Sequence, residues 1–306
     1  LLAAMFLPRF LSMGIDPVRA VWDAVFMAIS VFNNAGFVIL PEGLSPHVTD
    51  WWMLIPIILG TTVGAIGFPV IMDVAKNLRT PRRWRLHTKL TLSTYLILAF
   101  VGALALALTE WNNPATLGAI DTPSKILNAM LAGVNSRSSG LSALDVGAMH
   151  SQTHFVQDIL MMIGGGSAST AGGVKVTTFA VLVLAVIAEA RGDRDIETFG
   201  RRIPTSAVRL AVAVSLLGLA LVAVSVVLLL SMTHYSLDII LFETASAFAT
   251  VGLSTGITPI LPVGAKYVLI FLMFAGRTGS MTVAAALALR ERSRVIRMPE
   301  ERPIIG

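Results

Sequence analysis

One pattern occurs three times in the chain, and it restricts the fold more than any other feature of the sequence. Each occurrence has a short apolar helix, a tight turn that ends in glycine, and a long apolar stretch that itself contains small residues. We call the turns elbow 1, elbow 2 and elbow 3; they contain Asn34, Ala35 and Gly36, then Ser138, Ser139 and Gly140, then Thr250, Val251 and Gly252. The elbow glycines lie more than 100 residues apart. That distance is too long for a solenoid repeat and fits pairs of membrane-spanning helices with their loops.

Several stretches are long enough to cross the roughly 30 Å hydrocarbon core of a bilayer. Residues 90–108 and 210–230 contain no charge, and residues 51–75 and 267–289 contain one each. Charged residues make up 13% of the chain and the mean hydropathy is +0.78, whereas soluble domains are about 25% charged. The sequence therefore predicts an all-α, multi-pass membrane protein. Because cysteine is absent, a disulfide framework and a thiolate metal site are excluded.

The elbows predict a binding site for a dehydrated cation. Irregular backbone is tolerated at membrane depth only where it is buried in protein or lines a wet cavity. Backbone carbonyls around an axis replace the hydration shell of a cation, and the C-terminal end of each short helix adds partial negative charge. Any single elbow is also compatible with an ordinary turn. Three elbows in matching positions favour a pore lined by the carbonyls of the elbow residues.

Basic residues are concentrated on one side of the predicted membrane. They occur in residues 76–89, in residues 191–209 and in the tail from residue 290, whereas residues 33–50 contain no lysine or arginine. Cytoplasmic loops carry the excess of positive charge, so the elbows are predicted to face outward and the C-terminus to lie in the cytoplasm. These loops account for the net charge of +5, and nucleic-acid binding is not expected.

A run of small residues interrupts the second unit where its return helix should cross the membrane. We call residues 164–175 the glycine-rich loop; its predicted functional residues are Gly164, Gly165, Gly166, Ser167, Ala168, Ser169, Thr170, Ala171, Gly172, Gly173 and Lys175. Each glycine disfavours helix by about 1 kcal/mol relative to alanine, so the helix is expected to break there. We expect either a movable plug below the elbows or a close-packed interface of small residues.

Arg277 is the one charge in the last apolar stretch, between Gly276 and Thr278. An arginine at that depth costs several kcal/mol unless it faces a cavity or a partner, which makes it a functional candidate. The structural alternative is a guanidinium that binds backbone carbonyls of the broken helix. A contact between Arg277 and the glycine-rich loop would satisfy both interpretations, because it would hold the plug and repel cations.

The pattern divides the chain into three units, which are residues 1–88, 89–205 and 206–306. The short helices are expected at residues 22–31, 124–134 and 237–248. The return helices are expected at residues 51–75, from residue 155 across the glycine-rich loop, and at residues 267–289. The chain opens on apolar residues, so we expect it to start inside a spanning helix, with further repeats before residue 1.

These motifs resemble the KtrB/TrkH potassium-uptake proteins over essentially the whole chain. The similarity is carried by residues 31–37, 164–175, 246–254, 276–279 and 299–303. The resemblance implies four fused helix–pore loop–helix repeats around one pseudo-fourfold pore, of which the chain holds the second, third and fourth. By resemblance, the elbows are the selectivity filter, whose backbone carbonyls bind potassium, the glycine-rich loop is the gating loop, and Arg277 is the pore arginine. One departure is Ser136-Arg137-Ser138-Ser139-Gly140-Leu141, where the family commonly has Thr-Arg-Thr-Ala-Gly-Phe. Coordination by backbone carbonyls should tolerate that change.

The resemblance also implies potassium uptake across the bacterial cytoplasmic membrane, with sodium as a candidate stimulating ion and no cofactor bound by this chain. The implied partners are a cytosolic nucleotide-binding regulatory ring, a second copy in a homodimer, and the lipid bilayer. A sodium-preferring or poorly selective transporter of the same family is the first alternative, because the filter loop that bears on that preference is not among the three elbows.

A non-transporting membrane scaffold or enzyme is the second alternative. It would need a convergent polar site, but Arg277 and Lys175 are the only ionisable residues that the sequence places inside the membrane. The pair His150 and His154 has the spacing of metal ligands on a helix, but Ser151 replaces the glutamate of the zinc-protease motif and an outer loop is the expected location. Catalysis is therefore not expected.

Overall fold

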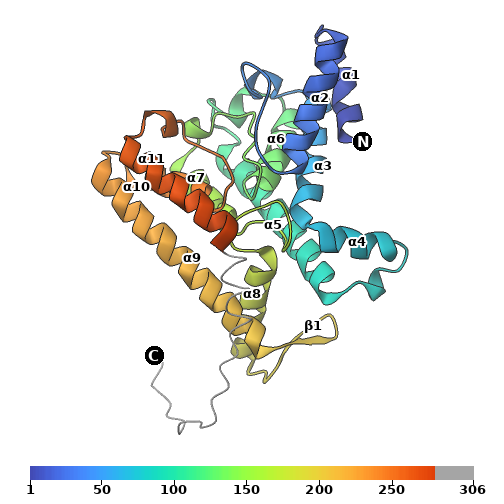
Figure 1. Ribbon diagram of the computed structural model, residues 1–306, viewed down its shortest axis with the longest axis vertical. Helices are drawn as coiled ribbons and strands as arrows, with labels where there is room; N and C mark the ends of the chain where they lie inside the picture. Colours follow the sequence, from blue (N-terminus) through green and yellow to red (C-terminus); the bar gives the residue numbers. More distant parts are fainter. Residues whose placement is uncertain (280–306) are drawn as a thin grey trace.

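The structure is a computed structural model that describes residues 1–279, and this part of the chain is mostly helical (Figure 1). The helices in chain order are α1 (Leu2–Ser12), α2 (Pro17–Phe32), α3 (Trp51–Ile66), α4 (Phe68–Lys76), α5 (Leu86–Glu110), α6 (Thr122–Asn135), α7 (Ser151–Met162), α8 (Val176–Arg191), α9 (Thr205–Met232), α10 (Leu237–Phe248) and α11 (Val263–Phe274). A short antiparallel hairpin of β1 (Ile196–Thr198) and β2 (Arg201–Ile203) was not predicted from the sequence. The basic tail and the end of the last predicted return helix lie outside the described residues.

Within residues 1–279, two helices are long and apolar enough to cross a membrane by themselves. They are α5, with 25 residues, and α9, with 28 residues. Along α9, the side chains of Leu216, Leu219 and Val227 are about 60% exposed or more. A helix surface with this many exposed large apolar side chains suits contact with lipid rather than with water. The apolar stretches at residues 90–108 and 210–230 therefore fall inside observed helices, and the prediction of an all-α membrane protein is confirmed in this coarse form.

The prediction of one return helix over residues 51–75 is wrong. The chain breaks at Gly67, and α3 and α4 meet at an angle of 94°. Gly67 has φ of +91°, and a Cβ at this position would lie 2.6 Å from the carbonyl oxygen of Ser167. The break exists because the glycine-rich loop packs against this turn, a contact that hydropathy cannot detect.

The short helices begin at polar caps that the sequence supplies. Asp16 accepts hydrogen bonds from the backbone N–H groups of Val18 and Arg19, and Asp121 accepts one from Ser124. Each aspartate is followed within two residues by proline, whose fixed φ suits the first helical turn. As a result α2 and α6 start earlier than predicted, whereas α10 has the predicted bounds.

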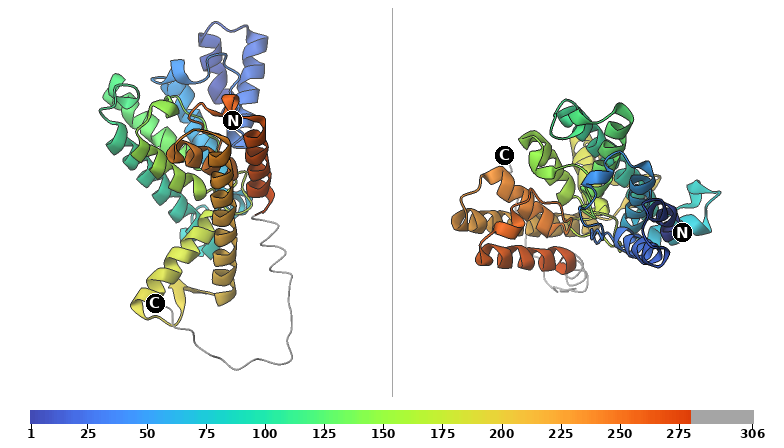
Figure 2. Two further views of the ribbon diagram at one scale, coloured as in Figure 1. Left: turned by 90° about the vertical axis from the view of Figure 1, so that its left-hand side faces the viewer. Right: turned by 90° about the horizontal axis from the view of Figure 1, so that it is seen from above.

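Buried side chains from successive units share their cores. Leu127 and Leu131 of α6 pack with Phe6 and Met27 of the first unit, and Phe242 of α10 packs in the cluster that contains Met161 of α7. Seen from above, the blue, green and orange segments occupy separate sectors around the middle of the molecule (Figure 2). The β hairpin lies at the end opposite α1 and α2 (Figure 1).

Candidate functional site

The three elbows come together although they are far apart in the sequence. A Cβ on Gly36 would lie 2.2 Å from the carbonyl oxygen of Ser139, and a Cβ on Gly140 would lie 2.4 Å from that of Val251. Gly252 has more space, with no atom nearer than 4.0 Å, but its φ is +99°. Glycine is thus required by close backbone approach at elbows 1 and 2, and by backbone conformation at elbow 3.

The carbonyl oxygens of all nine elbow residues are without a hydrogen-bond donor from residues 1–279. Most backbone carbonyls have a partner in the protein or in water, so these nine oxygens are left available to a ligand from outside the described residues. These oxygens carry partial negative charge and no proton. The arrangement therefore offers a cluster of oxygen ligands to a cation or to water.

Each elbow also holds a non-glycine residue in the left-handed region of the backbone map. Asn34 has φ of 52°, Ser139 has φ of 79° and Thr250 has φ of 51°. Residues with side chains rarely adopt this conformation, and they keep it only where the surroundings enforce it. In elbows 1 and 3 this residue stands two positions before the glycine, whereas in elbow 2 it stands directly before the glycine. Elbow 2 therefore turns in a different register.

The glycine-rich loop is irregular between the end of α7 and the start of α8. The loop closes on itself through two backbone hydrogen bonds, from Gly164 N–H to the Val174 carbonyl at 2.8 Å and from Val174 N–H to the Met162 carbonyl at 3.2 Å. Gly166 N–H binds the carbonyl of Ala65 in α3 at 2.8 Å. The loop thus has a defined structure that depends on a neighbouring unit.

This loop touches elbows 1 and 3. The side-chain amide of Asn34 donates to Thr170 Oγ1 at 2.5 Å, and the Thr170 hydroxyl donates to the carbonyl of Gly64 at 3.1 Å. A Cβ on Gly172 would lie 2.2 Å from Thr250 Oγ1. The loop and the elbows therefore form one connected site.

Both predicted cationic residues bind carbonyls of the loop. Arg277 lies in a π-helical segment, Ala275–Gly279, and its Nη1 donates to the carbonyl oxygen of Thr170. Lys175 Nζ donates to the carbonyl of Ala171 at 2.6 Å. The structure thus joins Arg277 and Lys175 to the glycine-rich loop, which in turn touches elbows 1 and 3. Single-turn π segments are often found at functional sites.

Arg137, next to elbow 2, is a residue whose importance the sequence analysis missed. It is fully buried, its Nη1 donates to the Tyr95 carbonyl at 2.9 Å, and its guanidinium carbon lies 3.7 Å from the centre of the Tyr95 ring. Stacking on an aromatic ring partly compensates for loss of hydration around the charge. A charge inside a motif of small residues was the available signal, since the sequence contains Arg137 between two serines.

The structure also buries ionisable residues that the sequence analysis did not single out. Besides Arg137, the structure buries Asp158 of α7 and Glu243 of α10, which are 5% and 4% exposed. Glu243 accepts hydrogen bonds from Ser254 Oγ at 2.8 Å and from Thr258 Oγ1 at 2.6 Å. Its carboxylate holds the segment that follows elbow 3, which is a structural role.

The prediction of an outer loop for both His150 and His154 is wrong for His154. His154 lies in α7, is 5% exposed, and its Nε2 is 2.7 Å from the carbonyl oxygen of Val146. His150 directly precedes α7, and its ring contacts Glu110 at 3.1 Å. No group of metal-binding side chains occurs among the described residues, and this pair forms none.

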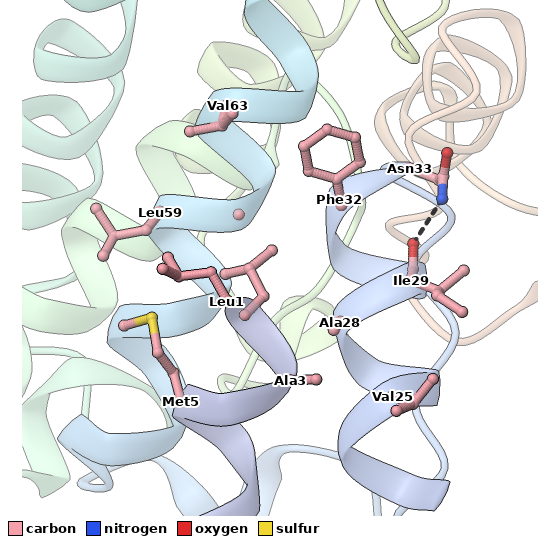
Figure 3. A pocket seen from close by; sticks show the side chains of 12 residues that line it. Leu1, Ala3, Met5, Val25, Ala28, Ile29, Phe32, Asn33, Leu59 and Val63 are labelled. Atoms are coloured by element: carbon pink, nitrogen blue, oxygen red, sulfur yellow. Dashed lines mark hydrogen bonds between the residues drawn. The ribbon is translucent and has the colours of Figure 1, made fainter.

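An apolar pocket lies beside the end of α2 that leads into elbow 1. It measures about 660 Å³ and is lined by apolar side chains of α1, α2 and α3, including Met5, Leu59 and Val63 (Figure 3). The polar side chain at its edge, Asn33, donates its amide to the Ile29 carbonyl at 2.9 Å. A solute site usually has several convergent polar groups, and this cavity lacks them.

Comparisons with known proteins all find cation transport proteins. Residues 2–296 match the family model described as TrkH, cation transport protein. The chain is similar to Ktr system potassium uptake protein B of Bacillus subtilis (strain 168), with 39% identity over 92% of this chain and 63% of that protein. It is similar to the protein of the same name from Vibrio alginolyticus, with 34% identity over 92% of this chain and 62% of that protein.

Two further similarities concern a sequence relative and a solved structure. The potassium/sodium uptake protein NtpJ of Enterococcus hirae is 32% identical over 100% of this chain and 67% of that protein. The crystal structure of the potassium transporter TrkH from Vibrio parahaemolyticus superposes with a TM-score of 0.71, covering 94% of this chain and 62% of that one. At 18% identity, that likeness supports the fold alone. The chain spans 62–63% of the length of the two Ktr relatives.

Proposed function

Because the chain belongs to the TrkH family of cation transport proteins, we propose that it mediates potassium uptake across the cytoplasmic membrane of a bacterial cell. It is a membrane protein with apolar helices, and its family is one of transporters rather than enzymes. The names of the two Ktr relatives, both potassium uptake proteins, support potassium as the transported ion.

The observation that carries the proposal is the set of nine elbow carbonyls, which have no donor among residues 1–279, at the meeting point of three glycine turns. Potassium entering such a site exchanges its hydration shell for carbonyl dipoles. The elbows then form three sides of the selectivity filter. Units 1–88, 89–205 and 206–306 supply three of the four helix–pore loop–helix repeats that the family resemblance implies around a pseudo-fourfold axis.

The glycine-rich loop acts in this proposal as the gate below the filter. Its contacts with Asn34, Thr250 and Arg277 support this role, because they join the loop to two elbows and to a fixed positive charge. With Arg277 bound to Thr170, the loop stands across the path and the guanidinium repels cations. Release of that contact lets the loop move aside.

The topology and the partners belong to the same proposal. The elbows face the outside, and the C-terminus and the basic segments lie in the cytoplasm, where a nucleotide-binding regulatory ring contacts them. Two copies of the protein form a homodimer in the bilayer. The transported cation is the substrate, and the chain itself binds no cofactor.

A sodium-preferring or poorly selective transporter is the second candidate. The name of the Enterococcus hirae relative, a potassium/sodium uptake protein, favours keeping this candidate. Because potassium and sodium differ in size and hydration, competition between the two ions separates the candidates. Potassium transport that excess sodium does not inhibit supports the first, and strong inhibition by sodium supports the second.

The test is uptake of rubidium and potassium by the complete gene product that carries this chain, with its regulatory subunit, in cells deficient in potassium uptake. The wild type is compared with Gly252→Ser and with Gly256→Ser. Both glycines have similar positive φ, +99° and +94°, and space for a side chain, but only Gly252 belongs to an elbow. The two variants therefore suffer similar backbone strain at different places.

Robust uptake by the wild type and by Gly256→Ser, with loss of potassium preference in Gly252→Ser, is the expected result. If the folded wild-type protein in the membrane transports neither potassium nor sodium, the transporter proposal fails. If both variants lose selectivity equally, strain rather than the filter explains the effect.

A further inference from the structure

The last turn of each short helix carries one buried polar side chain that binds its own elbow. The residues are Ser30 of α2, Asn135 of α6 and Ser246 of α10, which are 5%, 1% and 4% exposed. Nothing in the repeat pattern of the sequence alone draws attention to them, because serine and asparagine are ordinary near helix ends. Their shared property is the atom that each one binds.

Each side chain donates to the carbonyl of the residue directly after the elbow glycine. The three hydrogen bonds run from Ser30 Oγ to Phe37 O at 2.7 Å, from Asn135 Nδ2 to Leu141 O at 2.7 Å, and from Ser246 Oγ to Leu253 O at 2.6 Å. All three lengths are those of well-formed hydrogen bonds. The same contact thus occurs independently in all three units.

The backbone carbonyls of the same three residues bind N–H groups of the elbows. The carbonyls of Ser30, Asn135 and Ser246 accept hydrogen bonds from the N–H groups of Ala35 at 2.8 Å, Gly140 at 3.3 Å and Val251 at 2.9 Å. One residue therefore fixes its elbow at two points, at the N–H of a peptide inside the elbow and at the carbonyl directly after the elbow glycine. Those carbonyls themselves have no donor in the described part of the chain.

The type of side chain differs with the number of residues between the donor and the carbonyl that it binds. In elbows 1 and 3 a serine binds a carbonyl seven residues later, whereas in elbow 2 Asn135 binds a carbonyl six residues later. Elbow 2 also turns in a different register, with Ser139 rather than the preceding residue in the left-handed region. The donor nitrogen of asparagine stands one bond farther from Cβ than the hydroxyl of serine. The longer side chain therefore makes the same contact from a different backbone geometry.

We propose that Ser30, Asn135 and Ser246 are positioning residues of the selectivity filter, an inference that rests on the proposed function. Each one binds the carbonyl behind its elbow glycine and keeps that peptide turned away from the ion path. Glycine at positive φ permits rotation of the neighbouring peptides. Contacts of other residues must therefore fix the orientation of the elbow carbonyls. The fixed peptide after the glycine supplies that constraint.

The variants Ser30→Ala and Ser246→Ala remove the hydroxyl and leave the remainder of the side chain. The preference for rubidium over sodium in uptake is expected to fall about three- to tenfold in Ser30→Ala, as the loss of one hydrogen bond implies. The fall in Ser246→Ala is expected to be at least as large, because Ser246 Oγ also accepts a hydrogen bond from Gly252 N–H at 3.2 Å. Ser30→Thr and Ser246→Thr keep a hydroxyl and are expected to restore the preference. Asn135→Ser is expected to lose it, because a serine at this position is one bond too short to reach Leu141.

Thr244→Val is the matched control. Thr244 is a fully buried hydroxyl residue of α10 that binds only carbonyls of its own helix, those of Ile240 and Leu241. Its loss should leave the rubidium-to-sodium ratio at the wild-type value. A general packing defect would lower the amount of protein or the uptake of both ions, and would leave their ratio unchanged.

A second measurement separates the filter from gating and expression. Potassium stabilises a protein that binds it in the folded state, so the melting temperature of the purified wild type should rise with potassium more than with sodium. The alanine variants should lose this difference. Wild-type uptake of potassium together with unchanged ion ratios and unchanged potassium stabilisation in Ser30→Ala and Ser246→Ala overturns the inference alone. Absence of any cation uptake by the wild type overturns the proposed function instead.

Discussion

The elbows and the glycine-rich loop are both irregular and both contain glycine. They differ in whether hydrogen bonds to other units help to hold them. Each elbow is fixed by its own unit, since Ser30, Asn135 and Ser246 bind atoms five to seven residues away. The loop has hydrogen bonds of its own, but it is also fixed by other units. Its hydrogen bonds reach Ala65 in one direction and Arg277 in the other.

In the proposed function, this difference would allow one protein to combine a rigid filter with a movable gate. Contacts inside a unit persist when the units shift relative to one another, so the elbows keep their geometry. Contacts between units change with such shifts, so the loop responds to them. Substitutions at the elbows should therefore change selectivity, and substitutions at the loop should change the rate of transport at constant selectivity.

The largest expected effect is that of Gly36→Ala. A Cβ at Gly36 would lie 2.2 Å from the Ser139 carbonyl oxygen, and the φ of +77° adds backbone strain. We expect uptake to fall more than about tenfold, because backbone must move at two elbows. Gly43→Ala, with φ of +66° and open space, has the strain without the clash and should keep most of the uptake. Equal uptake in the two variants would contradict close contact between elbows 1 and 2.

Arg137→Lys tests the rigidity of elbow 2 through stability. Lysine keeps the charge but loses the planar group that stacks on Tyr95 and binds its carbonyl. We expect the free energy of unfolding to fall by about 1.5–3 kcal/mol, the typical contribution of a hydrogen bond to a charged group. Thermal unfolding in detergent measures this change. Arg19→Lys, at an exposed position of α2, is the control with little expected change, and an equally small change at Arg137 would refute the assigned role.

Arg277→Ala tests the loop. Removal of the hydrogen bond to Thr170 weakens the attachment of the loop to the third unit and removes the positive charge of Arg277. We expect basal rubidium flux to rise about tenfold while the ratio of rubidium to sodium uptake is retained. Flux that stays at the wild-type value, compared with the exposed control Arg79→Ala, would mean that Arg277 does not hold the gate.

The smallest expected effect is that of Thr170→Val. This change removes the acceptor for the Asn34 amide and the donor to the Gly64 carbonyl, and it keeps the shape of the side chain. Basal flux should rise about threefold, since a neutral hydrogen bond contributes less than a charged one. Thr233→Val, whose hydroxyl binds only the Leu229 carbonyl of its own helix, is the control. A change in selectivity rather than in flux would show that loop and elbows are not separate in function.

Features that depend on local composition were predictable from the sequence. The apolar stretches around α5 and α9, the helix α10 and the positions of the elbow glycines fall where hydropathy and turn chemistry indicate. The family was also accessible, because the motifs around the elbows and the glycine-rich loop are specific. The site roles of these residues stay predictions that the proposed experiments test.

Features that depend on distant contacts were not predictable. Gly67 is one of several glycines in an apolar stretch, and only the approach of Ser167 makes it a break of 94°. His154 was expected in an outer loop, yet packing of α7 against α10 buries it. Arg137 is buried because Tyr95, 42 residues earlier in the chain, offers its ring and its carbonyl.

The sequence by itself determined that this chain enters a membrane, where it turns and which family it resembles, because span length, charge and glycine are local properties. Only the tertiary structure decided which residues meet. The contacts of Asn34 and Arg277 with Thr170 join positions 136 and 107 residues apart. The three side chains that fix the elbows became recognisable only from the carbonyls that they bind, since hydrogen bonding depends on distance in space rather than in sequence.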